Sequence, residues 1–361
     1  MTSGTVPAQR ALWIGTYPAD GAAPGSGEGV WRVGLDTGSG RFGTPELAVS
    51  TASASFVALH PSGRTLYVVS ETAPGVVSAF TVDDDGGLTL SGSAPTGGAE
   101  ACHVLATPDR VWIANYGDGV AACLPVDPAS GALDAEQPAT FPHAGSGPDG
   151  DRQEGPHAHF VAVVGQDALV ADLGTDQLRR YAADGAATEP SIAAALPPGT
   201  GPRHLVALPD GALVVAGELD ARLHVLRPAG GGWEQATSVP AADMTAPGGA
   251  PSFPSHIELS ADAGLVTVGV RGADVLAVHR VHPAGTDGGD PTLEHLGDVP
   301  LGEGAWPRHH AVLEDGAGAM VVVADQGRRE LVAIRLDLSS GRGDITDRVE
   351  LPTPPACVVE A

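Results

Sequence analysis

The stretch His204–Glu218, HLVALPDGALVVAGE, consists of two short apolar runs joined by a Pro-Asp-Gly turn. Two such runs around a tight turn predict a β-hairpin. The chain repeats this pattern five more times, in Phe56–Glu71 (FVALHPSGRTLYVVSE), His103–Asn115 (HVLATPDRVWIAN), His159–Asp172 (HFVAVVGQDALVAD), His256–Arg271 (HIELSADAGLVTVGVR) and His309–Asp325 (HHAVLEDGAGAMVVVAD). The sequence is therefore organised as copies of one hairpin unit.

The spacing of these copies indicates their architecture. Their first residues are separated by 47, 56, 45, 52 and 53 positions, and a further β-rich run follows each copy. A period near 50 residues with about four short strands per unit is typical of a β-propeller. We therefore predict an all-β fold in which residues 1–361 form a single domain.

A seventh unit is divided between the two ends of the chain. Ala11–Tyr17 (ALWIGTY) and Gly29–Leu35 (GVWRVGL) resemble a second and a third strand, whereas Pro354–Glu360 (PPACVVE) resembles a first strand. Pairing the N-terminal strands with the C-terminal strand completes one blade and leaves no open sheet edge at the seam. The prediction is a seven-bladed β-propeller closed in this way.

Composition limits the kinds of partner. The net charge is −25, with 19 arginines and no lysine, which argues against nucleic acid and anionic membranes as partners.

No run reaches the roughly 18 apolar residues of a membrane span. Residues 1–10 lack a signal-peptide pattern, and three scattered cysteines do not suggest a disulfide framework. We expect a cytoplasmic protein that is a monomer or a small homo-oligomer.

The repeat also predicts where a site lies. In a propeller the first strand of each blade lines the central channel, and the second strand runs antiparallel to it. The starts of the first strands and the ends of the second strands should therefore meet at one mouth of the channel. Five of the six starts are histidine, in a chain with only 13 histidines. The predicted ends are Glu71, Asn115, Asp172, Glu218, Arg271 and Asp325. A bland alternative is that each histidine only bonds a neighbouring blade.

Several motifs carry a family resemblance. They are His143-x-Gly145-Ser146-Gly147-Pro148, RQEGPHAH (Arg152–His159), DLGTD (Asp172–Asp176), GPRH (Gly201–His204), Asn115-Tyr116-Gly117, Glu218-Leu219-Asp220, Arg271-Gly272 and Pro307-Arg308. With them the chain resembles, over nearly its whole length, the seven-bladed propeller lactonases. That family includes bacterial 6-phosphogluconolactonases and the fungal 3-carboxy-cis,cis-muconate lactonizing enzyme.

The resemblance implies lactone chemistry without a metal or an organic cofactor. It implies as catalytic residues His157 or His159, Arg203, Glu218 and Arg271. The other mouth positions are expected to bind the small lactone substrate, namely His204, His256, His309, Arg308, Asp172 and Asn115.

Each expected role follows from the chemistry of the side chain. Glu218 is expected to be a partly desolvated carboxylate and hence a stronger base toward water. Arg203 and Arg271 suit an anionic group of the substrate or the developing oxyanion. His157 or His159 would protonate the leaving alkoxide. Arg152 and Glu154 are expected only to brace their loop.

The substrate stays open because the chain departs from the family pattern at Gly217, Val270 and Ser255. We expect hydrolysis of 6-phosphoglucono-δ-lactone. The alternatives are a carboxylated muconolactone, acted on by a cycloisomerase, and an unphosphorylated aldonolactone. Two other classes of function stay open. One is a metal-dependent hydrolase that uses histidines with Asp172, Asp325 and Glu71. The other is a non-catalytic propeller that binds a metabolite or a protein.

Overall fold

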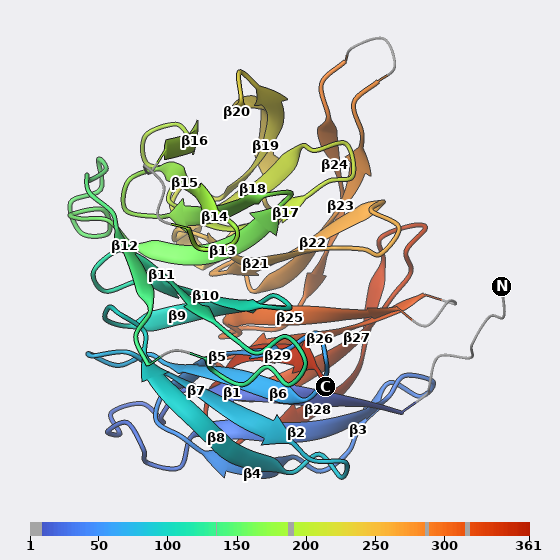
Figure 1. The fold of residues 1–361 in the computed structure, drawn as a ribbon. Coiled ribbons are helices and arrows are strands. Elements are labelled where there is room, and N and C mark those ends of the chain that lie inside the picture. Colours follow the sequence, from blue (N-terminus) through green and yellow to red (C-terminus); the bar gives the residue numbers. More distant parts are fainter. Residues whose placement is uncertain (1–8, 135, 187–190, 286–288, 315–317) are drawn as a thin grey trace, which may run out of the picture.

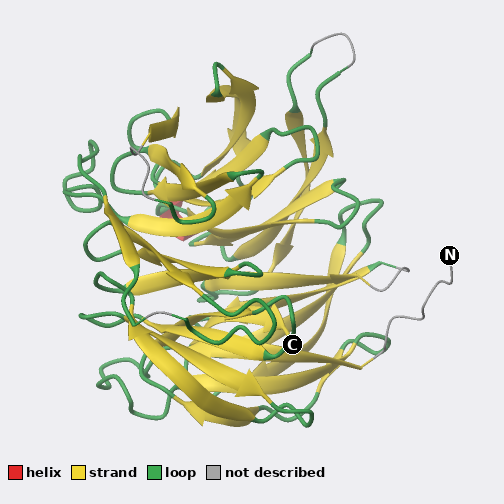
Figure 2. Ribbon diagram, in the orientation of Figure 1, coloured by secondary structure: helices red, strands yellow, loops and turns green. Residues whose placement is uncertain are grey.

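The computed structural model describes residues 9–134, 136–186, 191–285, 289–314 and 318–361. Within these ranges the chain forms strands almost throughout, with one short 3-10 helix at Pro247–Gly249 (Figure 2). No helix there is both long and apolar enough to cross a membrane. Residues 1–8, in the segment without a signal-peptide pattern, and residues 315–317, where the sequence predicts a turn, lie outside the described residues.

The strands form seven antiparallel sheets arranged in a ring, so the predicted all-β, seven-bladed propeller is confirmed. The first, innermost strands are β5 (Ala54–Leu59), β9 (Ala101–Ala106), β13 (Ala158–Val164), β17 (Pro202–Ala207), β21 (Phe253–Leu259), β25 (Pro307–Glu314) and β29 (Pro355–Glu360). The second strands are β6 (Thr65–Ser70), β10 (Arg110–Asn115), β14 (Asp167–Asp172), β18 (Leu213–Gly217), β22 (Leu265–Arg271), β26 (Ala319–Asp325) and β1 (Gln9–Thr16).

The outer half of each blade follows in sequence. The third strands are β7 (Val76–Val82), β11 (Val120–Pro125), β15 (Gln177–Ala182), β19 (Arg222–Ala229), β23 (Val275–His282), β27 (Glu330–Leu336) and β2 (Gly29–Asp36). The outermost strands are β8 (Leu88–Pro95), β12 (Ala139–Pro142), β16 (Ser191–Ala195), β20 (Gly232–Pro240), β24 (Thr292–Pro300), β28 (Gly343–Glu350), and the pair β3 (Arg41–Phe42) and β4 (Glu46–Ser50).

The ring closes as the sequence predicts. Strand β29 pairs antiparallel with β1, with Ile14 opposite Val358, and it also packs against β5 and β25 (Figure 1). Each first strand contacts the first strands of both neighbouring blades in the same manner. The innermost strands therefore form a closed ring around the central channel.

Apolar cores lie between successive blades. In one of them Leu276 and Val278 of β23 pack against Val321 and Val323 of β26, and all four are buried. Both faces of the inner strands are covered by neighbouring blades, which is why those strands are continuous apolar runs. Full burial of each such side chain contributes about 1.5–3 kcal/mol. This packing fixes the inner strands and so the positions of the side chains that they present to the channel.

Every first strand carries a β-bulge at the same end. All seven pairings between first and second strands shift register there, because the first strand holds one extra residue. Such bulges redirect side chains. Residues of the bulge are counted from the first-strand residue that pairs with the last residue of the second strand. In blade order, the second residues are Ser55, Cys102, His159, Arg203, Ser255, Arg308 and Ala356. The third residues are Phe56, His103, Phe160, His204, His256, His309 and Cys357. We call these the second and third bulge positions.

This alignment corrects one expectation. The sequence pattern predicts His159 in the same series as His103 and His204, but the pairing of Ala158 with Asp172 puts Phe160 in that series. His159 instead aligns with Arg203 and Arg308. A one-residue shift matters because it changes the direction of the side chain.

Candidate active site

The third bulge positions form the floor of the site. Going round the channel, the ring centroids are separated by 4.5 Å (Phe56–His103), 4.2 Å (His103–Phe160), 4.4 Å (Phe160–His204), 5.1 Å (His204–His256), 3.7 Å (His256–His309) and 5.1 Å (His309–Phe56). Rings also meet across the channel, with Phe56 and His204 6.4 Å apart. Six rings thus form a closed circle that fills the channel, which we call the floor ring.

The predicted substrate-binding residues His204, His256 and His309 belong to this floor ring and are buried. Burial lowers the pKa of each of these imidazoles well below its usual range, and the charge of Arg203 lowers it further. The Nδ1 atoms of His204 and His256 are 2.9 Å apart, so one donates a hydrogen bond to the other. These histidines are neutral parts of the floor and lie outside the residues that line the cavity next to it.

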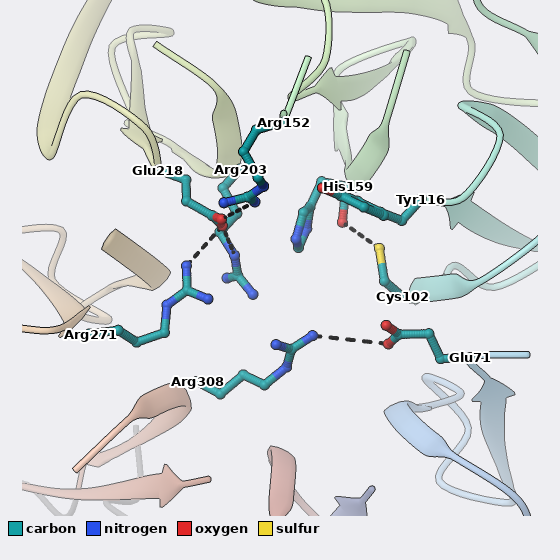
Figure 3. A pocket seen from close by; sticks show the side chains of 9 residues that line it. All are labelled: Glu71, Cys102, Tyr116, Arg152, His159, Arg203, Glu218, Arg271 and Arg308. Atoms are coloured by element: carbon teal, nitrogen blue, oxygen red, sulfur yellow. Dashed lines mark hydrogen bonds and ion pairs between the residues drawn. The ribbon is translucent and has the colours of Figure 1, made fainter. Parts of the chain in front are cut away.

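A cavity of about 200 Å³ lies next to the floor ring, because four of its lining residues directly precede ring residues in the chain. Figure 3 shows the side chains that line it. Its lining combines residues from the second bulge positions, residues at the ends of second strands, and one residue from the loop before β13. These are Cys102, His159, Arg203 and Arg308, then Glu71, Tyr116, Glu218 and Arg271, and finally Arg152. Six of the seven blades contribute to this lining, so only the closed ring assembles it.

Glu218 is the centre of an arginine cluster. Arg152 Nη2 donates a hydrogen bond to Glu218 Oε1 at 2.6 Å, and Arg271 Nη2 lies 2.8 Å from Oε2. Arg203 Nε also lies 2.8 Å from Oε2, although off the direction of a hydrogen bond, and Arg203 Nη1 has no hydrogen-bond partner. Glu218 and Arg203 are 4% and 3% exposed. Three guanidinium groups therefore converge on one buried carboxylate.

The expectation that desolvation makes Glu218 a stronger base is wrong. Burial by itself raises the pKa of this carboxyl group, but the charges of Arg271 and Arg203 outweigh it and hold the pKa well below its usual range. Glu218 consequently remains ionised and is a weak proton acceptor. Its evident effect is to orient the arginines that surround it.

A second polar cluster lies on the other side of the cavity. The hydroxyl group of Tyr17, which directly follows β1, donates a hydrogen bond of 2.7 Å to Glu71 Oε2. Arg308 Nη2 donates a hydrogen bond to the same hydroxyl oxygen and lies 4.0 Å from Glu71 Oε2. The guanidinium of Arg308 also lies over the Tyr17 ring, 4.8 Å from its centroid. Arg308 therefore reaches the cavity, as the sequence predicts.

The two histidines of RQEGPHAH have different surroundings. His157 has both nitrogens engaged, Nδ1 at 2.7 Å from the Tyr116 carbonyl oxygen and Nε2 at 3.2 Å from Glu154 Oε1. Its ring stacks on Tyr116, with centroids 4.3 Å apart. His159 lines the cavity, and its Nδ1 has no hydrogen-bond partner. His157 thus supports the cavity wall, and Glu154 holds His157.

The expected acid role of His159 also needs correction. Burial lowers the pKa of His159 well below its usual range, and the charge of Arg203 adds to this effect. The imidazole is therefore neutral near pH 7. It can offer one N–H as a hydrogen-bond donor, but it does not hold the extra proton of an imidazolium acid.

Asn115 and Asp172 do not reach the cavity. Both are fully buried and end their strands, one residue before the position that faces the site. Asn115 Nδ2 donates a hydrogen bond to the Val120 carbonyl oxygen at 2.9 Å. Asp172 accepts hydrogen bonds from His143 Nδ1 at 2.8 Å and from the backbone N–H of His157 at 2.9 Å. They position the loops around the site.

Sequence reasoning missed three lining residues, whereas Glu71 was expected at the mouth as a strand end. Cys102 was not singled out, Tyr116 was noted only within a motif, and Arg152 was expected only to brace its loop. The signal that identifies Cys102 is the bulge alignment, in which it matches Arg203. Arg152 is recognisable only through its contact with Glu218, 66 residues away.

The cavity is electropositive in a strongly acidic chain. Four arginines and two glutamates line it, which leaves a formal charge of +2 where the whole chain carries −25. Among the described residues, no group of three or more His, Cys, Asp or Glu side chains is arranged to hold a metal ion. The charged chemistry of the cavity thus rests on guanidinium and carboxylate groups.

Comparisons with known proteins agree with this architecture. The chain is 29% identical over 358 residues to the 6-phosphogluconolactonase of Bacillus subtilis strain 168, covering 96% of this chain and 97% of that protein. A structure from Bacteroides fragilis superimposes with a TM-score of 0.83 at 25% identity over the full length of both chains. The periplasmic gluconolactonase of Pseudomonas aeruginosa gives a TM-score of 0.82 at 25% identity, over 98% of this chain and 99% of that chain. Residues 11–359 match the family model "Lactonase, 7-bladed beta-propeller", and the chain therefore belongs to the seven-bladed β-propeller lactonases.

Proposed function

We propose that this lactonase hydrolyses 6-phosphoglucono-δ-lactone to 6-phosphogluconate. The observation that carries the proposal is the charge of the cavity, +2 from its lining residues. A phosphate monoester carries about −1.5 to −2 charge at pH 7, so the cavity and this substrate are complementary. The similarity to the Bacillus subtilis 6-phosphogluconolactonase supports the same substrate.

The unsatisfied hydrogen-bond donors of Arg203 support the proposal that the cavity binds an anionic ligand. Arg203 is almost completely buried, and its Nη1 has no partner within the described chain. Burial, together with the charge of Arg271, lowers the pKa of Arg203 to about 9, so a further anion beside this guanidinium is favourable. An incoming phosphate or a developing oxyanion would supply the missing acceptor.

The lining residues divide the work of hydrolysis in this proposal. Arg203 and Arg271 stabilise the oxyanion that forms when water attacks the lactone carbonyl. Glu218 holds both guanidinium groups in place, and Arg152, with a 36% exposed side chain, meets the phosphate at the rim. Neutral His159 donates a hydrogen bond to the ring oxygen as its bond to the carbonyl carbon breaks.

The size of the cavity fits a small metabolite. Its volume of about 200 Å³ lies below the roughly 300–1,000 Å³ of sites that take drug-sized ligands. Unphosphorylated glucono-δ-lactone is the second candidate, because the similar Pseudomonas aeruginosa protein is named a gluconolactonase.

The test compares the two lactones. Acid release is followed at constant pH with excess chelator present, and the spontaneous rate is subtracted. Hydrogen bonds to charged groups contribute about 1.5–3 kcal/mol, so kcat/KM should be at least about tenfold higher for the phosphorylated lactone. An equal or lower value would move the assignment to glucono-δ-lactone. Activity that chelation abolishes would instead point to the metal-dependent alternative.

We propose a place in the cytoplasmic pentose phosphate pathway, where such a phosphorylated lactone is consumed. The three cysteines are buried thiols that form no disulfide, which is compatible with a reducing compartment. Fractionation of cells that express the chain from its own start should recover the protein with cytoplasmic markers. Recovery from the periplasm, the location of the Pseudomonas aeruginosa protein, would contradict this.

A further inference from the structure

The cavity contains two carboxylates, and only one of them is fully engaged. Glu218 and Glu71 extend from different blades to opposite sides of the cavity (Figure 3). Both oxygens of Glu218 face arginine donors, at 2.6 and 2.8 Å. The carboxylate of Glu71 has one hydrogen bond, from Tyr17 to Oε2. In the described part of the chain Oε1 of Glu71 has no partner.

From this difference we propose that Glu71 is the general base that activates water in this reaction, and that Tyr17 and Arg308 are its positioning residues. The inference rests on the proposed lactone hydrolysis. A general base needs an oxygen within reach of water and free to accept a proton. Glu71 offers one, with 22% of its side chain exposed, whereas 4% of Glu218 is exposed and its oxygens are occupied.

The residues around Glu71 form a support of the kind that catalytic bases require. Tyr17 donates its hydroxyl proton to Oε2 and accepts a hydrogen bond from Arg308. Burial raises the pKa of Tyr17 well above its usual range, so its hydroxyl group remains a donor near pH 7. Since the hydroxyl group fixes one carboxylate oxygen, the other is left pointing in a defined direction. This nucleophile–base–orienter logic recurs at unrelated hydrolytic sites.

Arg308 makes no direct hydrogen bond to Glu71, whereas three arginines contact the carboxylate oxygens of Glu218. Its nearest nitrogen lies 4.0 Å from Oε2, beyond hydrogen-bond distance, with the Tyr17 hydroxyl group as the bridge. The cavity thus separates two functions. One wall, around Glu218, presents positive charge to the substrate, and the other wall presents a carboxylate with a free oxygen.

The reaction balances with Glu71 as the only proton carrier. Glu71 Oε1 takes a proton from water while the water oxygen forms a bond to the lactone carbonyl carbon, and the negative charge passes to the carbonyl oxygen. As the carbonyl re-forms, the bond between that carbon and the ring oxygen breaks. The protonated Glu71 then gives its proton to the ring oxygen, which becomes the hydroxyl group of the product acid. One lactone and one water give one hydroxy acid, and Glu71 returns to its ionised form.

The experiment is chemical rescue of a variant that lacks the carboxylate. Glu71→Ala should lower kcat at least about 100-fold, the usual contribution of a general base, with KM changed less than about threefold. Added formate or acetate should restore turnover in proportion to its concentration, more strongly for the more basic acetate at equal occupancy. A carboxylate needed only for structure would not give this dependence on the basicity of the added anion.

Glu46→Ala is the matched control. It removes an exposed glutamate on the outer strand β4, so turnover and the response to formate should equal those of the wild type. Tyr17→Phe keeps the ring and removes the donor, and it should lower kcat about 3- to 30-fold without rescue by formate, consistent with the loss of one hydrogen bond.

The failure of this inference is distinct from that of the proposed function. Wild-type hydrolysis of the phosphorylated lactone together with undiminished turnover of Glu71→Ala would overturn the role of Glu71 alone. A large loss that neither formate nor acetate rescues, in a variant that unfolds at the wild-type temperature, would also overturn it. A wild-type protein that hydrolyses neither lactone would overturn both.

Discussion

Arg203 Nε lies 2.8 Å from Glu218 Oε2, and the two residues belong to a single hairpin, Arg203 in β17 and Glu218 directly after β18. The structure contains the ion pair within the cavity, so the same contact that stabilises the hairpin also presents the Arg203 guanidinium to the site.

Glu218→Gln should impair both stability and turnover. Removing the negative charge leaves three guanidinium groups without their shared partner, and breaking a buried ion pair costs about 3–5 kcal/mol. We expect a lower unfolding temperature and kcat/KM reduced at least about 100-fold, because the oxyanion donors lose their orientation. Calorimetry and lactone hydrolysis measure the two effects, with Glu46→Gln as control. Undiminished turnover would remove Glu218 from the mechanism.

Arg152→Ala should change the choice of substrate. Arg152 is the most exposed arginine of the Glu218 cluster, so its loss removes one positive charge from the rim and leaves Arg203 and Arg271 on Glu218. We expect kcat/KM to fall about 10- to 100-fold for the phosphorylated lactone and less than about threefold for glucono-δ-lactone. The control Arg64→Ala removes an exposed arginine remote from the cavity lining. Equal losses for both lactones would exclude phosphate recognition by Arg152.

Substitution of His157 and substitution of His159 should have clearly different effects on turnover. His157→Phe keeps the stacking on Tyr116 and should retain turnover within about fivefold, since His157 only supports the wall. His159→Phe should lose turnover about 10- to 100-fold, because a donor within the cavity disappears. Steady-state rates on the same lactone decide between them. The opposite order would make His157 the catalytic histidine.

The floor ring should make stability depend on pH. Burial lowers the pKa of its histidines below the unfolded value of about 6.5, that of His103 to about 3. The folded state therefore binds fewer protons than the unfolded state between these values. The histidines' contribution is complete above about pH 6.5 and is lost as the pH falls below it, at up to about 1.4 kcal/mol per pH unit for each histidine. Urea unfolding at pH 7, 6 and 5 measures this slope.

The control for that measurement is a phenylalanine substitution in the floor ring. Phe56 and Phe160 show that this ring position accepts phenylalanine. His103→Phe should fold and should reduce the slope by the share of one histidine. An unchanged slope would mean that His103 does not contribute to the acid sensitivity of the fold.

The fold could be predicted from the sequence because its evidence is local and repeated. Each copy of the hairpin has its own turn and its own apolar runs, and the unpaired Pro354–Glu360 indicated the closure that β29 and β1 make. The mouth as the location of the cavity followed from topology alone. Glu218, Arg203, Arg271, Arg308 and His159 line that cavity, and their roles in the reaction stay predictions.

The errors have two physical causes. A bulge inserts one residue without disturbing the apolar pattern, so the choice between His159 and Phe160, or between Asn115 and Tyr116, could not be made from periodicity. The pKa of Glu218 is lowered by Arg271 and Arg203, which the assembled ring brings beside it, whereas Glu218 alone suggested only desolvation. Register at a bulge and long-range charge are both properties of the assembled ring.

The bulge repeated in all seven blades gives the site a modular construction. One backbone geometry presents seven interchangeable side chains around a common axis, and four of them, Cys102, His159, Arg203 and Arg308, already differ in chemistry. The other three, Ser55, Ser255 and Ala356, are small. New specificities can therefore arise by exchanging single residues at these positions while the sheets stay intact, so the ring is a scaffold on which evolution, or a designer, can vary the chemistry one blade at a time.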